Sequence, residues 1–127
     1  MPKKFILKDS GKREKYDTGA VRDIREDKGR FDLITPFALL RLARVYEKGA
    51  IKYSERNWEQ GIKISRCLDS AERHINQYKM GMTDEDHLAQ AAWNLFSAMH
   101  FEEILPDMFD LPDYSKKVVK TKKERKK

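Results

Sequence analysis

Residues 83–106, which read TDEDHLAQAAWNLFSAMHFEEILP, decide the fold. Thr83 and Asp86 have the spacing of a capping box, and the acidic residues around them suit the positive end of a helix dipole. The apolar residues that follow recur at helical spacing and form one wide stripe: Leu88, Ala91, Ala92, Leu95, Phe96 and Met99. Pro106 marks a stop. The segment therefore predicts an amphipathic helix with this stripe against a core.

Two further helices are predicted upstream of it. Thr35 suits an N-cap, Pro36 the first helical position and Gly49 the residue after the end. The apolar face of this helix is Leu39, Leu42, Ala43 and Tyr46. A second helix runs from an N-cap at Ser65 to Gly81, with an apolar face of Leu68, Ala71, Ile75 and Tyr78. Three helices with short connections predict an all-α fold, a small helical bundle.

The two ends of the chain differ from this middle. Residues 1–34 have scattered apolar positions and no helical period, which predicts an irregular N-terminal arm with a short strand at Phe5–Leu7 or Phe31–Ile34. Residues 115–127 hold eight of the 27 basic residues and one acidic residue. Such a run predicts a disordered basic tail. We therefore divide the chain into a basic arm at 1–17, a helical domain at 18–114 and the tail.

Length and composition set the class of protein. A chain of 127 residues fits one domain, because domains typically run to roughly 100–200 residues. No stretch approaches the ~20 apolar residues of a membrane span. Phe5–Leu7 is too short for a signal peptide, and the single cysteine, Cys67, fits a reducing compartment. We expect a cytoplasmic protein without a membrane span, and the small core favours a homo-oligomer.

The third predicted helix carries polar groups beside its apolar stripe. His87 and Asn94 lie only about 20° apart around the axis, at the border of the stripe, so they would face a cleft between helices. Asp84, Glu85 and Asp86 come directly before. Carboxylates and imidazoles are ligands for Mg²⁺ or Mn²⁺. The alternatives remain helix capping for the carboxylates and a hydrogen-bonded core position for the histidine.

The second predicted helix adds His74, about 80° from the centre of its apolar side. Four polar residues gather on the opposite side of this helix: Asp69, Glu72, Arg73 and Asn76. In an isolated bundle that side would face solvent. Against a partner chain, Asp69 and Glu72 would instead form a carboxylate pair for a metal.

Residues 52–58, KYSERNW, have the groups that a nucleotide needs. Lys52 and Arg56 offer cations to phosphate, and Tyr53 and Trp58 offer aromatic planes to a base. Asn57 adds an amide for a base edge. An ordinary charged surface connection would look similar. The same alternatives hold for three cations of the arm: Arg22, Lys28 and Arg30.

Six ordered blocks make the sequence similar to one phage family: TGAVRD at 18–23, KGRFDL at 28–33, GAIKY at 49–53, RNW at 56–58, SAERH at 70–74, and DHL at 86–88 with WN at 93–94. Over about residues 18–104 the chain resembles the N-terminal domains of dATP/dGTP diphosphohydrolases. The resemblance implies a fold related to all-α MazG-like pyrophosphohydrolases and an oligomer that uses Mg²⁺ or Mn²⁺. The implied reaction converts a purine deoxynucleoside triphosphate and water to the monophosphate and pyrophosphate.

The chain departs from the MazG-like pattern, which holds its metals with E-E-x-x-E on one helix and E-x-x-D on the next. Glu102 and Glu103 occur here without the rest of that signature. For an enzyme, we assign metal binding or water activation to Asp86, His87, His74 and Glu72. Phosphate would contact Lys52, Arg56 and Arg73, and the base or sugar would contact Asn57, Trp58 and Asn94. Two other functions stay open: nucleotide sequestration without hydrolysis, and nucleic-acid binding through the basic ends.

Overall fold

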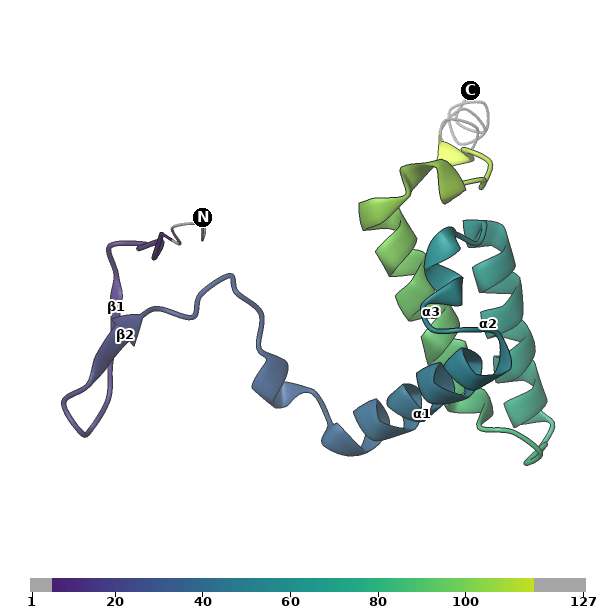
Figure 1. Ribbon diagram of the computed structural model, residues 1–127, viewed down its shortest axis with the longest axis horizontal. Helices are drawn as coiled ribbons and strands as arrows, with labels where there is room; N and C mark the ends of the chain where they lie inside the picture. The colour runs from purple at the N-terminus through teal and green to yellow at the C-terminus, as the bar shows by residue number, and fades with distance from the viewer. Residues whose placement is uncertain (1–5, 116–127) are drawn as a thin grey trace, which may run out of the picture. The chain divides into compact units, whose positions relative to one another are not determined.

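A computed structural model describes residues 6–115 of the chain (Figure 1). Contacts divide the chain into two compact units, with the boundary between Thr35 and Pro36. The first unit holds a small hairpin and the second holds the three α-helices, which confirms the predicted mostly helical fold. The predicted basic tail lies outside the described residues, apart from Ser115. Within residues 6–115, no helix combines the length and apolar content of a membrane span.

The N-terminal unit contains a two-stranded antiparallel hairpin of β1 (Arg13–Lys15) and β2 (Val21–Asp23). Gly19, at a φ of +90°, helps to reverse the chain between them, because glycine adopts the left-handed region without steric cost. Both strands are mainly charged and exposed, so no apolar alternation marks them in the sequence. The strand predicted at 31–34 is wrong, since Phe31–Leu33 forms a 3₁₀ helix, η1.

The other strand prediction, at 5–7, is also wrong for its described part. Ile6 and Leu7 belong to no strand, and Phe5 lies outside the described residues. Ile6 and Leu7 are 85% and 95% exposed. Without a neighbouring strand or a buried face, three apolar residues do not specify a strand.

The helical unit contains α1 (Pro36–Lys52), η2 (Asn57–Gln60), α2 (Ile64–Lys79), α3 (His87–Ile104) and η3 (Pro106–Met108). The predicted start of α1 at Pro36 is confirmed. The predicted end at Gly49 is wrong, because the helix continues to Lys52. Gly49 keeps a helical backbone there, and its carbonyl accepts a hydrogen bond from the Tyr53 N–H at 2.9 Å.

The core lies between α2 and α3, which pack along each other (Figure 1). Phe101 and Cys67 are completely buried, and Ile64 and Ala98 complete the central cluster. Fully burying a large apolar side chain such as Phe101 or Ile64 contributes about 1.5–3 kcal/mol. Six half-buried residues, one from α2 and five from the flanking segments, cover this cluster: Trp58, Ile62, Leu68, Leu105, Met108 and Leu111.

The predicted buried stripe of α3 is largely wrong. Leu88, Leu95, Phe96 and Met99 are 42–52% exposed, and of the stripe only Ala91 is fully buried. The side facing the other helices instead carries small or polar residues that end in Phe101: His87, Ala91, Asn94, Ala98 and Phe101. Small side chains allow close helix approach. Because α3 is apolar on two sides, periodicity alone does not select the side that packs inward.

The start of α2 also differs from the prediction. The helix begins at Ile64, and Lys63 occupies the N-cap position. The Lys63 side chain makes no capping hydrogen bond to the helix. Ser65 is not the cap. Its N–H and its hydroxyl both donate to the Asp110 carboxylate, at 2.9 and 2.5 Å. Asp110, from the segment after η3, therefore supplies the cap that α2 lacks locally.

The buried face of α2 consists of Ile64, Cys67, Ala71 and His74. In contrast to the predicted face, Ile75 and Tyr78 are exposed. His74 therefore lies on the inner side of the helix and not at its flank. Gly81 follows the end of the helix at a φ of +82°, as predicted for a helix terminus.

Candidate functional site

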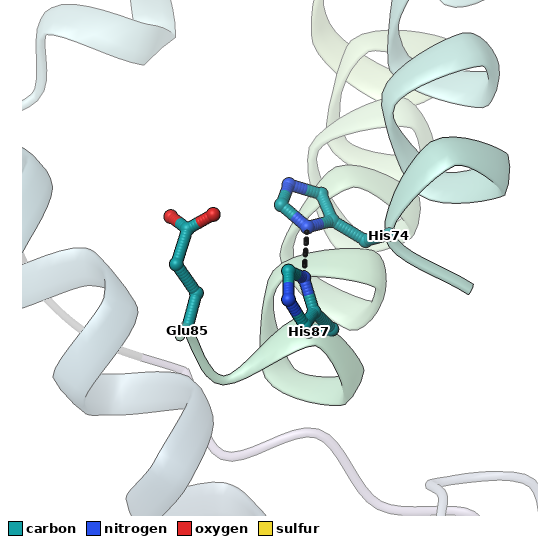
Figure 2. A group of neighbouring side chains, drawn as sticks. All are labelled: His74, Glu85 and His87. Carbon is teal, nitrogen blue, oxygen red and sulfur yellow. Dashed lines mark hydrogen bonds between the residues drawn. The ribbon is translucent and has the colours of Figure 1, made fainter. Parts of the chain in front are cut away.

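The turn between α2 and α3 brings two histidines together. Gly81 reverses the chain, and α3 then returns along α2. His74 of α2 and His87 at the first position of α3 are 4% and 2% exposed. Their Nδ1 atoms lie 2.9 Å apart, at hydrogen-bond distance (Figure 2). A buried imidazole pair is thus formed where the sequence predicted two separate histidine positions.

Asp84 determines how the pair shares its protons. The Nε2 of His87 lies 2.8 Å from Asp84 Oδ1, and this hydrogen bond lowers the pKa of the Asp84 carboxyl. An ionised carboxylate only accepts, so Nε2–H of His87 donates to it. In a neutral ring, Nδ1 of His87 then carries a lone pair and accepts from Nδ1–H of His74. Burial, followed by the charge of Arg73, lowers the pKa of His74, which favours its neutral form.

Glu85 completes the cluster from the turn before α3. Ligand atoms of His74, Glu85 and His87 all lie within 4.8 Å of one another. Figure 2 shows the Glu85 carboxylate beside the two rings. Its Oε1 accepts a hydrogen bond from Gln90 Nε2 at 2.9 Å, which orients the group. Two imidazoles and a carboxylate are a common ligand set for a divalent transition metal.

Asp86, predicted as a metal or catalytic residue, has structural partners. Its two oxygens accept a bidentate hydrogen bond from Arg41 of α1, at 2.8 and 2.6 Å. One of them also accepts from the Ala89 N–H at 3.2 Å, which makes Asp86 the N-cap of α3. The predicted capping box is therefore wrong, because Asp86 and not Thr83 caps the helix. The interaction with Arg41 lowers the pKa of Asp86.

The remaining predicted residues of α2 and α3 are not members of the cluster. Glu72 and Arg73 are exposed on α2, together with Asp69 and Asn76. The cluster does not include Glu72. Asn94 is buried on the inner side of α3, and its Nδ2 donates to the Gln90 carbonyl within the same helix at 2.9 Å.

The predicted nucleotide-binding segment begins at Lys52, the last residue of α1. Lys52 Nζ lies 5.2 Å from the centroid of the exposed Tyr53 ring. Arg56, in the left-handed region, pairs with Glu59 at 2.6 Å. The Asn57 amide oxygen accepts from Gln60 at 3.2 Å. These side chains are exposed.

Trp58 lies in an aromatic cluster of the helical unit. Its ring centroid is 4.8 Å from that of His100, 5.7 Å from that of Tyr46 and 6.4 Å from that of Trp93. Trp58 also packs against the buried core. This packing gives Trp58 a structural role that the sequence pattern did not indicate.

The three predicted cations of the arm belong to the N-terminal unit. Arg22 lies opposite Glu14 in the hairpin register. Lys28 lies 3.5 Å from Asp23, and Arg30 pairs with its neighbour Asp32 through two hydrogen bonds of 2.8 and 2.7 Å. An open concavity of about 620 Å³ in this unit is lined partly by Arg30. Each cation thus has an acidic neighbour.

Three residues with contacts in or around α2 and α3 were not assigned from the sequence. Glu85 was considered as a metal ligand beside a capping role but was not among the assigned site residues, although its place two residues before His87 was a local signal. Arg41 and Asp110 had none, because each contacts a partner 45 residues away in the chain. Such contacts depend on how the helices pack.

Comparison with known proteins finds a matching protein family and a similar phage protein. The family described as dATP/dGTP diphosphohydrolase, N-terminal, matches residues 18–110. A relative from Salmonella phage PMBT28, named dATP/dGTP diphosphohydrolase, is 37% identical over 79 residues, which cover 57% of this chain and 27% of the relative. The chain thus spans about a quarter of that relative's length. No solved structure matches the chain.

Proposed function

Because the chain belongs to the family of dATP/dGTP diphosphohydrolase N-terminal domains, we propose that it hydrolyses a purine deoxynucleoside triphosphate to the monophosphate and pyrophosphate. The observation that carries the proposal is the cluster of His74, Glu85 and His87. The matched region, residues 18–110, contains all three residues. The similarly named relative supports nucleotide hydrolysis as the class of reaction.

The reaction that we propose needs a divalent cation, and the cluster has suitable donors for one. Two imidazole nitrogens and a carboxylate oxygen lie close enough for small side-chain movements to bring them onto one ion. Such an ion, when bound, polarises a phosphate oxygen and lowers the pKa of a bound water. The MazG-like carboxylate signature is absent, so this ligand set replaces it in our proposal.

The side chains around the cluster would hold its ligands in place. Asp84 fixes the proton of His87 on Nε2, and Gln90 orients the carboxylate of Glu85. Asp86 joins the first turn of α3 to Arg41 of α1. Ligand groups must be held within about 0.5 Å of a productive geometry, and contacts of this kind do so.

Phosphate binding is proposed for two exposed cations of the helical unit, Arg73 and Lys52. Arg73 directly precedes His74, and its described hydrogen bond is a weak one of 3.4 Å to Ser70. Its guanidinium would therefore be available for bidentate contacts to phosphate. Lys52 is also exposed. We propose Tyr53, which is 64% exposed, for base stacking in preference to the packed Trp58.

The experiment incubates the purified chain with each dNTP and NTP in Mn²⁺ or Mg²⁺ and separates the products by anion-exchange chromatography. Monophosphate and pyrophosphate from one or two purine substrates would support the proposal. The matched control for variants of the cluster histidines is His100→Gln, because His100 lies against Trp58 and outside the cluster. Equal turnover in this variant is expected.

Two other results would overturn the proposal in favour of a different function. Retention of a nucleotide without turnover would indicate a sequestering protein. No nucleotide binding, together with salt-sensitive nucleic-acid binding that deletion of residues 115–127 removes, would indicate an accessory protein that acts through its basic end.

A further inference from the structure

We propose that His74, Glu85 and His87 bind a first-row transition metal ion, of the series from Mn²⁺ to Zn²⁺, in preference to Mg²⁺, with Asp84 as the outer carboxylate that holds His87. This inference names the class of ion that the proposed function would use. It rests on the proposed function only for what the ion does. The binding itself is measured without nucleotide, so the two can fail separately.

The spacing of the two imidazoles fits two ligands of one ion. Bonds of about 2.0–2.1 Å from a metal to two imidazole nitrogens at roughly 90–110° would place those nitrogens about 3 Å apart. The Nδ1 atoms of His74 and His87 are already 2.9 Å apart. An ion therefore requires the proton of His74 to move from Nδ1 to Nε2, and the rings to turn until the Nδ1 lone pairs meet at one point, while the two helices stay where they are.

The contact between Asp84 and His87 has the form of a metal-site outer shell. A metal-bound histidine almost always donates its other N–H to a carboxylate, a carbonyl or water, which fixes the ring and its tautomer. Nε2 of His87 has such a carboxylate at 2.8 Å. Asp84 thereby leaves Nδ1, the atom that faces His74, as the site for a ligand bond.

The third donor closes the site on its exposed side. Glu85 is exposed, and its carboxylate lies beside the two buried rings (Figure 2). The hydrogen bond from Gln90 uses only Oε1, so the described contacts leave Oε2 for an ion. Three protein donors leave coordination positions open for water and phosphate oxygens.

The donor set determines the class of ion. Mg²⁺ prefers oxygen ligands in near-ideal octahedral geometry, whereas imidazole suits Zn²⁺, Fe²⁺, Ni²⁺ and their neighbours. Two of the three donors here are imidazoles. Mg²⁺, a hard ion, would bind these nitrogens only weakly, whereas an ion of the transition series would bind all three groups well.

The test titrates the full chain with Co²⁺, whose visible absorption reports bound nitrogen and oxygen ligands. We expect one Co²⁺ per chain, displaced by Zn²⁺ and not by excess Mg²⁺. His74→Gln and His87→Gln should lose the bands, while His100→Gln should keep them. Asp84→Asn should weaken binding about 10–100-fold, as for other outer-shell changes.

Variants at the exposed residues Asp84 and Glu85 separate a loss of Co²⁺ binding from a loss of folding. Asp84 has a side chain that is 59% exposed, so Asp84→Asn should fold normally; Glu85→Gln should do so as well. Wild-type Co²⁺ affinity in Asp84→Asn or in either folded histidine variant would overturn the proposal, as would displacement by Mg²⁺. Specific Co²⁺ binding without nucleotide turnover would refute only the proposed hydrolysis. Turnover that both histidine variants retain, without Co²⁺ binding, would refute only the metal site.

Discussion

Replacing Asp86 by alanine should separate its structural role from the predicted catalytic one. The change removes the N-cap of α3 and the bidentate pair with Arg41. Loss of an N-cap costs about 0.5–2 kcal/mol, and loss of a largely exposed ion pair costs about 0.2–1 kcal/mol. The Arg41 side chain is 50% exposed, which places the pair in the exposed class. We expect Asp86→Ala to lower the free energy of unfolding by about 1–3 kcal/mol in total.

The assay is urea unfolding followed by tryptophan fluorescence, because Trp58 and Trp93 lie in the aromatic cluster of the helical unit. Asp86→Ser is the matched control, since serine also caps helices and loses only the ion pair. It should cost about 0.2–1 kcal/mol, and Arg41→Ala should cost the same. Asp86→Ser should still bind one Co²⁺, but more weakly than the wild type, because the contact with Arg41 is lost. An unfolding curve for Asp86→Ala equal to that of the wild type would refute the structural role, and loss of Co²⁺ from folded Asp86→Ser would make Asp86 a ligand.

Three further predictions concern the rest of the helical unit. Gly61→Ala should destabilise it by about 1–3 kcal/mol in the same urea assay, because Gly61 has a φ of +115° and a Cβ there would lie 2.9 Å from Met108 Sδ; unchanged stability would contradict this. The hydrogen bonds from Ser65 lower the pKa of Asp110, so their stabilisation should be present above about pH 4 and lost as the pH falls through the lowered pKa. The difference in unfolding free energy between wild type and Asp110→Asn should therefore shrink in acid, and a constant difference would exclude the linkage. We also expect the predicted oligomer to bury the exposed apolar side of α3, so Phe96→Glu should reduce the sedimentation coefficient, and an unchanged value would exclude this face.

Local signals predicted the three helices and some of their ends. Pro36 fixes the start of α1 because a missing N–H has no cost at the first helical position. Gly81 follows the end of α2 in the left-handed region that glycine favours. These signals act within a few residues, so a sequence contains all of the information about them.

The packing of the helices was harder to predict. α3 is apolar on two sides, and the side with Leu95 and Phe96 is the half-exposed one. His74 was expected at the flank of α2, because Ile75 and Tyr78 shifted the apparent centre of its apolar face. Which side packs inward depends on the close approach of neighbouring helices, and that is a tertiary property.

The candidate site was predicted in part. His74 and His87 were both selected from the sequence, but their direct contact requires the actual rotation of each helix. Asp86 was selected as a ligand, and its pairing with Arg41 was invisible because 45 residues separate them. Glu85, the third member of the cluster, was considered as a ligand with Asp84 and Asp86, but helix capping explained it equally well and it was not assigned to the site.

The most direct test of the central claim is the rate of dATP and dGTP hydrolysis to the monophosphate by His87→Ala, measured in Mn²⁺ beside the wild type and His100→Gln. Circular dichroism would establish first that the variant keeps its helices. We expect wild-type and His100→Gln turnover to be equal and His87→Ala turnover to be abolished. A folded His87→Ala protein that releases pyrophosphate at the wild-type rate would contradict the assignment of the reaction to the histidine cluster.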